Sequence, residues 1–104
     1  MALKVYIAGK VSGEPLAQCT MKFGTAQKEI EACGWIAINP LEVISKHAYG
    51  LHRAIEWEEA MKVCLTCLLT SDAVYVLRDW QDSPGATIEV ELAKKLKLKI
   101  IYPK

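Results

Sequence analysis

The chain alternates between short apolar runs and longer segments in which apolar residues recur every three or four positions. The short runs are rich in β-branched and aromatic residues, which is typical of strands. The run 73–77 has no polar position, as expected for a strand that is buried on both faces of a sheet. Strands are therefore predicted at residues 3–8, 35–39, 73–77 and 98–102.

The longer segments have the spacing of amphipathic helices. In residues 19–33 the apolar positions follow one another in alternating steps of four and three. A second helix is predicted over residues 54–69. A third covers residues 84–96, because Ser83 and the proline after it suit the N-cap and the first helical position. Residues 41–53 are the least regular part and predict at most a short helical turn.

This order of elements predicts an α/β fold. Strands that alternate with helices favour a parallel sheet with right-handed crossovers. We expect a Rossmann- or flavodoxin-like three-layer sandwich, with a four-stranded parallel sheet in the order 2-1-3-4 and helices on both faces. Such an order has a switch point between strands 1 and 3, and ligands of open α/β sheets bind beyond the carboxyl ends of the strands there.

Composition narrows the class of protein. The 104 residues suffice for one domain, expected over residues 1–104, and 52% of them are apolar, which excludes wholesale disorder. The net charge of +1 gives no field that would attract duplex nucleic acid or an anionic membrane surface. No apolar run reaches the length of a membrane span, and residues 1–10 do not have the pattern of a secretory signal. We therefore expect a cytoplasmic protein whose four cysteines are thiols.

The most informative segment is the predicted helix that follows Ser83. On a helical wheel, Ile88, Leu92 and Leu96 form an apolar stripe, and Glu89 falls inside that apolar face. Glu91 falls on the opposite, solvated side. The wheel alone leaves alternatives open, since Glu89 could be paired with Lys or Arg, or the helix could be rotated differently about its axis.

Small residues precede Glu89 on the same helix. Helical side chains lean toward the N-terminus, and the preceding turn holds only Gly85 and Ala86, so open space is expected above the carboxyl group. Free N–H groups at this helix start favour an anion such as a ligand phosphate, to which the Ser83 hydroxyl could also donate. The alternative is that Ser83 is an N-cap and nothing more.

A zinc site is a weaker candidate. Cys64 and Cys67 have zinc-like spacing, and His47 and His52 could complete four ligands. The cysteines, however, belong to a helical apolar pattern, and buried thiols are common in protein cores. No metal and no cofactor are therefore expected.

Two loops are expected to border the crevice. The loop at residues 9–13 follows the first strand, and it is either a plain turn or a ligand-binding loop that includes Gly9 and Ser12. The loop after the third strand carries Trp80, a candidate for stacking on a base.

Several short motifs together resemble the nucleoside 2-deoxyribosyltransferase superfamily. The resemblance is closest to a small branch of uncharacterised, often phage-encoded proteins described as domains of unknown function, and it extends over nearly the whole chain. The motifs are Tyr6-Ile7-Ala8-Gly9, Asn39-Pro40, Ser71-Asp72-Ala73 and Ser83-x-Gly85-Ala86-x-x-Glu89-x-x-x-Ala93.

The resemblance implies hydrolysis or transfer at an N-glycosidic bond of a (deoxy)nucleoside or nucleoside 5′-monophosphate. In it, Glu89 would be the nucleophile that forms a covalent glycosyl-enzyme, with Tyr6 beside it in the catalytic pair. Ser83 favours a 5′-monophosphate, because the nucleotide-hydrolysing relatives carry Ser at this position. The residues expected to bind the substrate are Gly9, Ser12, Asn39, Trp80, Ser83, Gly85 and Ala86.

The chain departs from the pattern of the active relatives at Cys64, where they usually carry an Asp that handles the base and its proton. A thiol replaces a carboxylate in that role only if its pKa is perturbed. A non-catalytic nucleotide-binding module of the same fold is therefore the alternative, and an interaction protein without a ligand is a third. The resemblance also implies a homodimer or larger homo-oligomer.

Overall fold

The computed structural model describes residues 2–103 and contains one parallel sheet of four strands. The strands are β1 (Lys4–Ala8), β2 (Ile36–Ile38), β3 (Ala73–Val76) and β4 (Lys99–Ile101). They lie in the order β2-β1-β3-β4, with every neighbouring pair parallel. The sequence prediction of the sheet and its order is thereby confirmed.

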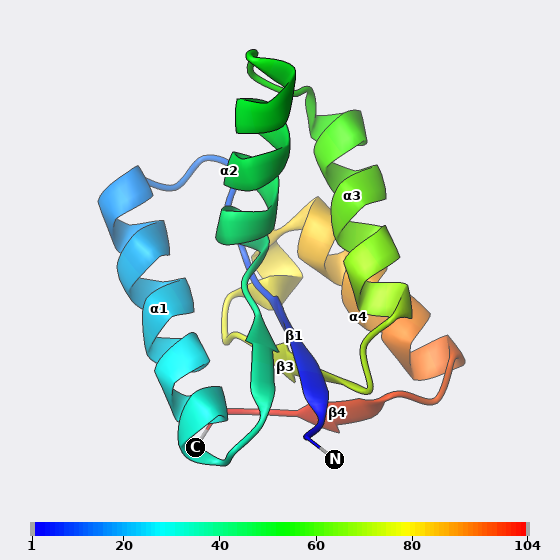
Figure 1. Ribbon diagram of the computed structural model, residues 1–104. Helices are drawn as coiled ribbons and strands as arrows, with labels where there is room; N and C mark the ends of the chain where they lie inside the picture. Colours follow the sequence, from blue (N-terminus) through cyan, green and yellow to red (C-terminus); the bar gives the residue numbers. More distant parts are fainter. Residues whose placement is uncertain (1, 104) are drawn as a thin grey trace.

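Helices cover both faces of this sheet and complete a three-layer α/β sandwich (Figure 1). The helices are α1 (Leu16–Ala32), α2 (Pro40–Leu51), α3 (Trp57–Leu69) and α4 (Pro84–Lys95), with a short 3-10 turn, η1 (Trp80–Asp82), before α4. No helix within residues 2–103 is long and apolar enough to cross a membrane.

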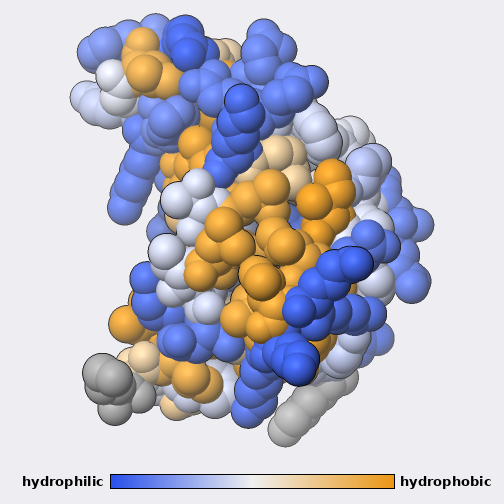
Figure 2. Space-filling model, turned by 90° about the vertical axis from the view of Figure 1, so that its right-hand side faces the viewer, coloured by the Kyte–Doolittle hydropathy of each residue, from blue (hydrophilic) through white to orange (hydrophobic). Residues whose placement is uncertain are grey.

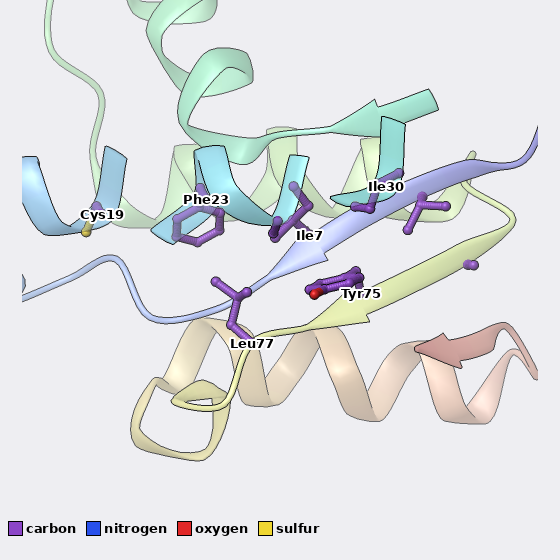
Figure 3. Packing of buried hydrophobic residues seen from close by; sticks show 9 residues of the cluster. Ile7, Cys19, Phe23, Ile30, Tyr75 and Leu77 are labelled. Atoms are coloured by element: carbon purple, nitrogen blue, oxygen red, sulfur yellow. The ribbon is translucent and has the colours of Figure 1, made fainter. Parts of the chain in front are cut away.

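The two central strands divide the core into two clusters. Side chains of a strand alternate between the two faces of a sheet, so β1 sends Val5 and Ile7 to one face and Tyr6 and Ala8 to the other. The first face packs against Phe23 and its neighbours on α1 (Figure 3). The second face packs against α3 and α4 through Cys64, Leu68, Val90 and Ala93.

Helix α2 corrects the prediction for residues 41–53, where only a short turn was expected. Asn39 is its N-cap, because its side chain accepts a hydrogen bond from the Leu41 N–H at 3.0 Å, and Pro40 occupies the first turn. The helix ends at Leu51, and the C-cap residue His52 has a left-handed backbone with φ of 58°. Pro40 is buried in this helix, and Leu41 and Ile44 are partly buried against the two core clusters.

Figure 1 shows α2 and α3 extending together beyond the carboxyl ends of the strands. The two helices are joined by polar contacts that Glu59 on α3 makes with His47 Nε2 at 3.2 Å and with Arg53 Nη1 at 3.0 Å. The prediction that α3 starts at Ala54 is three residues early. The α2–α3 pair thus forms a wall above the switch point between β1 and β3.

Candidate functional site

A pocket of about 310 Å³ lies at the carboxyl ends of β1 and β3, under the α2–α3 wall. Its size is at the lower end of the range for small-molecule sites. One side is formed by Pro40 and Ile44 of α2 and by Trp57 and Met61 of α3. The opposite side is formed by the start of α4, and the floor holds the polar groups described next.

Glu89 and Tyr6 meet at the floor of this pocket. Glu89 lies on α4 with 5% of its surface exposed, and Tyr6 lies on β1 with none exposed. The Tyr6 hydroxyl donates a hydrogen bond to Glu89 Oε2 at 2.5 Å. This hydrogen bond holds Oε2 in place and does not involve the other carboxyl oxygen, Oε1.

Glu89 has no cationic partner among residues 2–103, so the alternative of a structural ion pair does not apply. Burial raises the pKa of Glu89 to about 7, and the hydrogen bond from Tyr6 opposes this rise. The carboxyl group therefore changes protonation state near neutral pH. Perturbed carboxyl groups in clefts are markers of functional sites.

Cys64 is the third ionisable side chain of the pocket. It lies on α3, lines the pocket, and interacts with the Tyr6 hydroxyl. Burial raises the pKa of the Cys64 thiol to about 11, although the hydrogen bond with Tyr6 lowers it. Burial and the neighbouring Glu89 likewise raise the pKa of Tyr6 well above 10. At neutral pH both groups keep their protons.

The start of α4 differs in one respect from the anion site that was expected. Ser83 Oγ accepts a hydrogen bond from the Ala86 N–H at 3.2 Å, and the Ser83 carbonyl accepts one from the Thr87 N–H at 2.9 Å. Ala86 N–H is thus already used for capping the helix. These two bonds do not use the Gly85 N–H or the Ser83 hydroxyl proton, so both can donate to a ligand.

A family whose description is "Domain of unknown function (DUF4406)" matches residues 3–102. The chain belongs to this family. Comparison with curated proteins and with solved structures gives no match. The family description names no activity, and the pocket is the feature of this DUF4406 domain that bears on its chemistry.

Most of the residues predicted to form a site do line one pocket of the DUF4406 domain. These are Tyr6, Gly9, Ser12, Ser83, Gly85, Ala86 and Glu89. Gly9 has to be small there, because a Cβ at this position would overlap the Leu77 side chain. The first and third loops of the sheet thus converge as the switch-point rule predicts.

Two predicted ligand-binding residues lie elsewhere. Asn39 caps α2 and donates from Nδ2 to Gln27 Oε1 at 3.1 Å, so its amide is used structurally. Trp80 does not line the pocket, and its ring instead lies 5.5 Å from the Lys94 ammonium. Both side chains serve packing and capping in this structure.

The apolar wall of the pocket was not predicted from the sequence. Trp57 and Met61 line the pocket and pack close to Gly85, where a Cβ would come within 3.0 Å of Met61 Sδ. Trp57 was not among the predicted site residues, and 44% of its surface is exposed. Pro40 and Ile44 could have been found only by predicting α2, for which the pair Asn39-Pro40 was the available signal.

The helical wheel of α4 also needs correction. Ile88 and Leu96, expected in the apolar stripe, are 43% and 48% exposed. The face that packs against the sheet is formed by Ala86, Val90 and Ala93, with Glu89 among them. The inward orientation of Glu89 is confirmed, but the stripe is rotated toward smaller residues.

A polar cluster holds the loop between β1 and α1 in place beside the pocket. Lys22 Nζ on α1 donates to the Lys10 carbonyl and to Glu14 Oε1, each at 2.8 Å, and also forms an ion pair with Asp79. The Lys10 N–H donates to Asp79 Oδ1 at 3.1 Å. These bonds join the two loops that border the pocket.

The residues considered for zinc do not come together. Across residues 2–103, no three His, Cys, Asp or Glu side chains are grouped so that they could hold a metal ion. Cys64 and Cys67 are free thiols, and His47 contacts Glu59.

Proposed function

We propose that this protein cleaves or transfers the N-glycosidic bond of a (deoxy)nucleoside or nucleoside 5′-monophosphate, with Glu89 as nucleophile. The observation that carries the proposal is a buried carboxyl group that has no cationic partner among residues 2–103 and is held by a tyrosine hydroxyl at the floor of a ligand-sized pocket. The sequence resemblance to nucleoside 2-deoxyribosyltransferases assigns the nucleophile to the same residue.

In this mechanism Glu89 Oε1 attacks the anomeric carbon of the sugar while the base departs. The Tyr6 hydroxyl donates to Oε2 and thereby orients the carboxylate, so that the other oxygen faces the sugar. Water or a second base then attacks the glycosyl-enzyme from the opposite side. Two displacements give net retention of configuration.

The walls of the pocket suit the two ends of such a substrate. Trp57, Met61 and Ile44 offer apolar and aromatic surface for a planar base. Ser83 and the Gly85 N–H at the start of α4 offer donors for a hydroxyl or phosphate group on the sugar.

The test is covalent trapping. A 2-fluoro-sugar nucleoside or nucleotide is incubated with the protein, and the intact chain and its peptides are weighed by mass spectrometry. The expected result is one glycosyl adduct on Glu89, absent from Glu89→Gln. Glu91→Gln is the matched control, because Glu91 lies on the exposed side of the same helix. Absence of an adduct, together with base release that Glu89→Gln leaves unchanged, would contradict the proposal.

A second candidate, a nucleotide-binding module without turnover, is favoured by Cys64. Its buried thiol, with a pKa of about 11, occupies the position at which active relatives are expected to carry an acid. Calorimetry that shows nucleotide binding, with no free base after prolonged incubation, would favour this candidate. Turnover that depends on Glu89 would exclude it.

We further propose that a second copy of the chain covers the outer face of α3 and α4. Figure 2 shows apolar side chains gathered on this side of the molecule. Leu69 of α3 and Ile88 of α4 are 57% and 43% exposed, and the half-exposed Trp57 of α3 also lines the pocket. Light scattering should report a dimer or larger oligomer that Leu69→Lys with Ile88→Lys converts to a monomer. A monomeric wild-type protein would refute this arrangement.

A further inference from the structure

Of the described side chains that line the pocket, three ionise in the pH range of proteins. Among its described lining residues these are Tyr6 from β1, Cys64 from α3 and Glu89 from α4. The loop after β1 contributes Gly9, Val11 and Ser12, and α2 contributes Pro40 and Ile44, none of which titrates. No Lys, Arg, His or Asp belongs to this described lining.

A neutral purine base leaves far more readily when a proton is donated to it, and none of the described side chains that line this pocket is placed to give one. Glu89 has to be an anion to attack the sugar, so it cannot also be the acid. The Tyr6 proton is engaged with Glu89 Oε2. The Cys64 thiol is a much weaker acid than an effective proton donor at neutral pH, because burial raises its pKa.

We propose, on the basis of the proposed function, that the pocket selects glycosides whose base carries a fixed positive charge and whose sugar is not phosphorylated. N-alkylpyridinium nucleosides and N7-alkylpurine nucleosides belong to this class. Such a base is already activated as a leaving group, so the missing acid is not required.

The bonds and charges balance without a proton donor. Glu89 Oε1 forms a bond to C1′, the C1′–N bond breaks, and its electron pair moves to the ring nitrogen. This neutralises the cationic base, which departs without a proton. Water then attacks C1′, the ester bond to Glu89 breaks, and the proton of that water is released to solvent.

Electrostatics supports the same class of ligand independently of the leaving-group argument. Glu89 is 5% exposed and has no cationic side chain beside it among residues 2–103, so its anion lacks a counter-charge. A cationic ring supplies that charge, and the Trp57 indole on the pocket wall is the side chain that best accepts a cation on its face. A phosphate dianion would add negative charge to a pocket in which Glu89 is already anionic.

The binding test uses two ligands of equal size that differ in charge. Nicotinamide riboside carries a pyridinium ring, whereas its 1,4-dihydro form is uncharged. Calorimetry at pH 8 should give at least about tenfold tighter binding of the pyridinium form, and Glu89→Gln should remove this preference. Equal affinity for the two forms, or tighter binding of nicotinamide riboside 5′-phosphate, would overturn the inference.

The turnover test separates this inference from the proposed function. Release of base from 7-methylguanosine and from guanosine is followed by chromatography, after subtraction of the reaction without protein. Glu89-dependent cleavage of the methylated nucleoside alone supports both proposals. Equal cleavage of the two supports the proposed function and overturns the charge selectivity. Charge-selective binding without any cleavage overturns the proposed function but leaves the ligand class supported.

Discussion

Two tyrosine–glutamate pairs lie on opposite faces of the same sheet, and they differ in the burial of the carboxyl group. On the α3–α4 face, Tyr6 donates to Glu89, which is buried at the floor of a pocket. On the α1 face, Tyr75 donates to Glu29, whose side chain is exposed at the surface. In Figure 3 the Tyr75 ring lies among the apolar residues under α1.

The comparison shows that a buried tyrosine alone does not make a reactive site. Burial raises the pKa of Tyr75 to about 12, as it also raises that of Tyr6, so both hydroxyls are donors at neutral pH. The two pairs differ in the carboxyl group: Glu89 is buried and lines the pocket at the switch point, whereas Glu29 is exposed and does not line it. The functional difference therefore lies in the glutamate.

The sharpest test of the comparison is the loss of activity on removing each carboxylate. Glu89→Gln should lower base release by about 10³-fold or more, because it removes the nucleophile while keeping shape and an acceptor for Tyr6. Glu29→Gln should leave the rate within about twofold of the wild-type rate, since Glu29 lies at the surface and does not line the pocket. The measurement is free base released from a cationic nucleoside, with circular dichroism as the control for folding. Equal losses in the two variants would remove the distinction.

The next effect is on stability, and it follows from the titration of Glu89. In the unfolded chain Glu89 titrates near 4.5, whereas in the folded protein it titrates near 7. Between these values the folded state keeps a proton that the unfolded chain has released. The protonated Glu89 carboxyl group therefore contributes to the stability of the folded state. This contribution is complete below about pH 4.5 and is lost as the pH rises through about 7.

Glu89→Gln should accordingly be more stable than wild type by about 3 kcal/mol at pH 8, and by little at pH 4. Urea denaturation at the two pH values measures the difference, with Glu29→Gln as the control that shows no such dependence. Base release by the wild type should rise over the same pH range, because attack requires the anion. A stability difference that is the same at pH 4 and pH 8 would show that Glu89 does not titrate there.

Removal of each hydroxyl gives a smaller effect. Tyr6→Phe leaves a buried carboxylate without its donor, so the free energy of unfolding at pH 8 should fall by about 2 kcal/mol. Tyr75→Phe should cost about 0.5–1 kcal/mol, since water can replace the hydroxyl at the exposed Glu29. Urea denaturation measures both variants, and a Tyr75→Phe loss as large as that of Tyr6→Phe would contradict the role given to burial.

The sheet and the inward carboxyl group could be predicted from local patterns. Apolar runs such as residues 73–77 encode strands directly, and the alternation of strands with helices restricts the topology. The Tyr6–Glu89 contact could not be obtained in this way, because it joins residues 83 positions apart. It was expected only from the resemblance to a family.

The predictions for helices α4 and α2 were wrong in part, and the structure shows where. The stripe on α4 was misplaced: Ile88 and Leu96 are exposed, whereas Ala86, Val90 and Ala93 pack against the sheet and Leu92 is partly buried beside them. Helix α2 was missed although its apolar residues do recur with a helical period. Its position is set by capping at one end and by contact with α3, and a pattern of hydrophobic positions does not report these.

The smallest predicted effect separates two helix caps, of which one lies in the pocket and one outside it. Asn39 caps α2 with a bond of 3.0 Å from the Leu41 N–H, and Ser83 caps α4 with a bond of 3.2 Å from the Ala86 N–H. Asn39→Ala and Ser83→Ala should each lower the free energy of unfolding by about 1 kcal/mol. Since only Ser83 lines the pocket, only Ser83→Ala should also weaken binding of nicotinamide riboside in calorimetry. If Asn39→Ala bound nicotinamide riboside more weakly while its helix content stayed unchanged, Asn39 would have to be a ligand-binding residue as well as a helix cap.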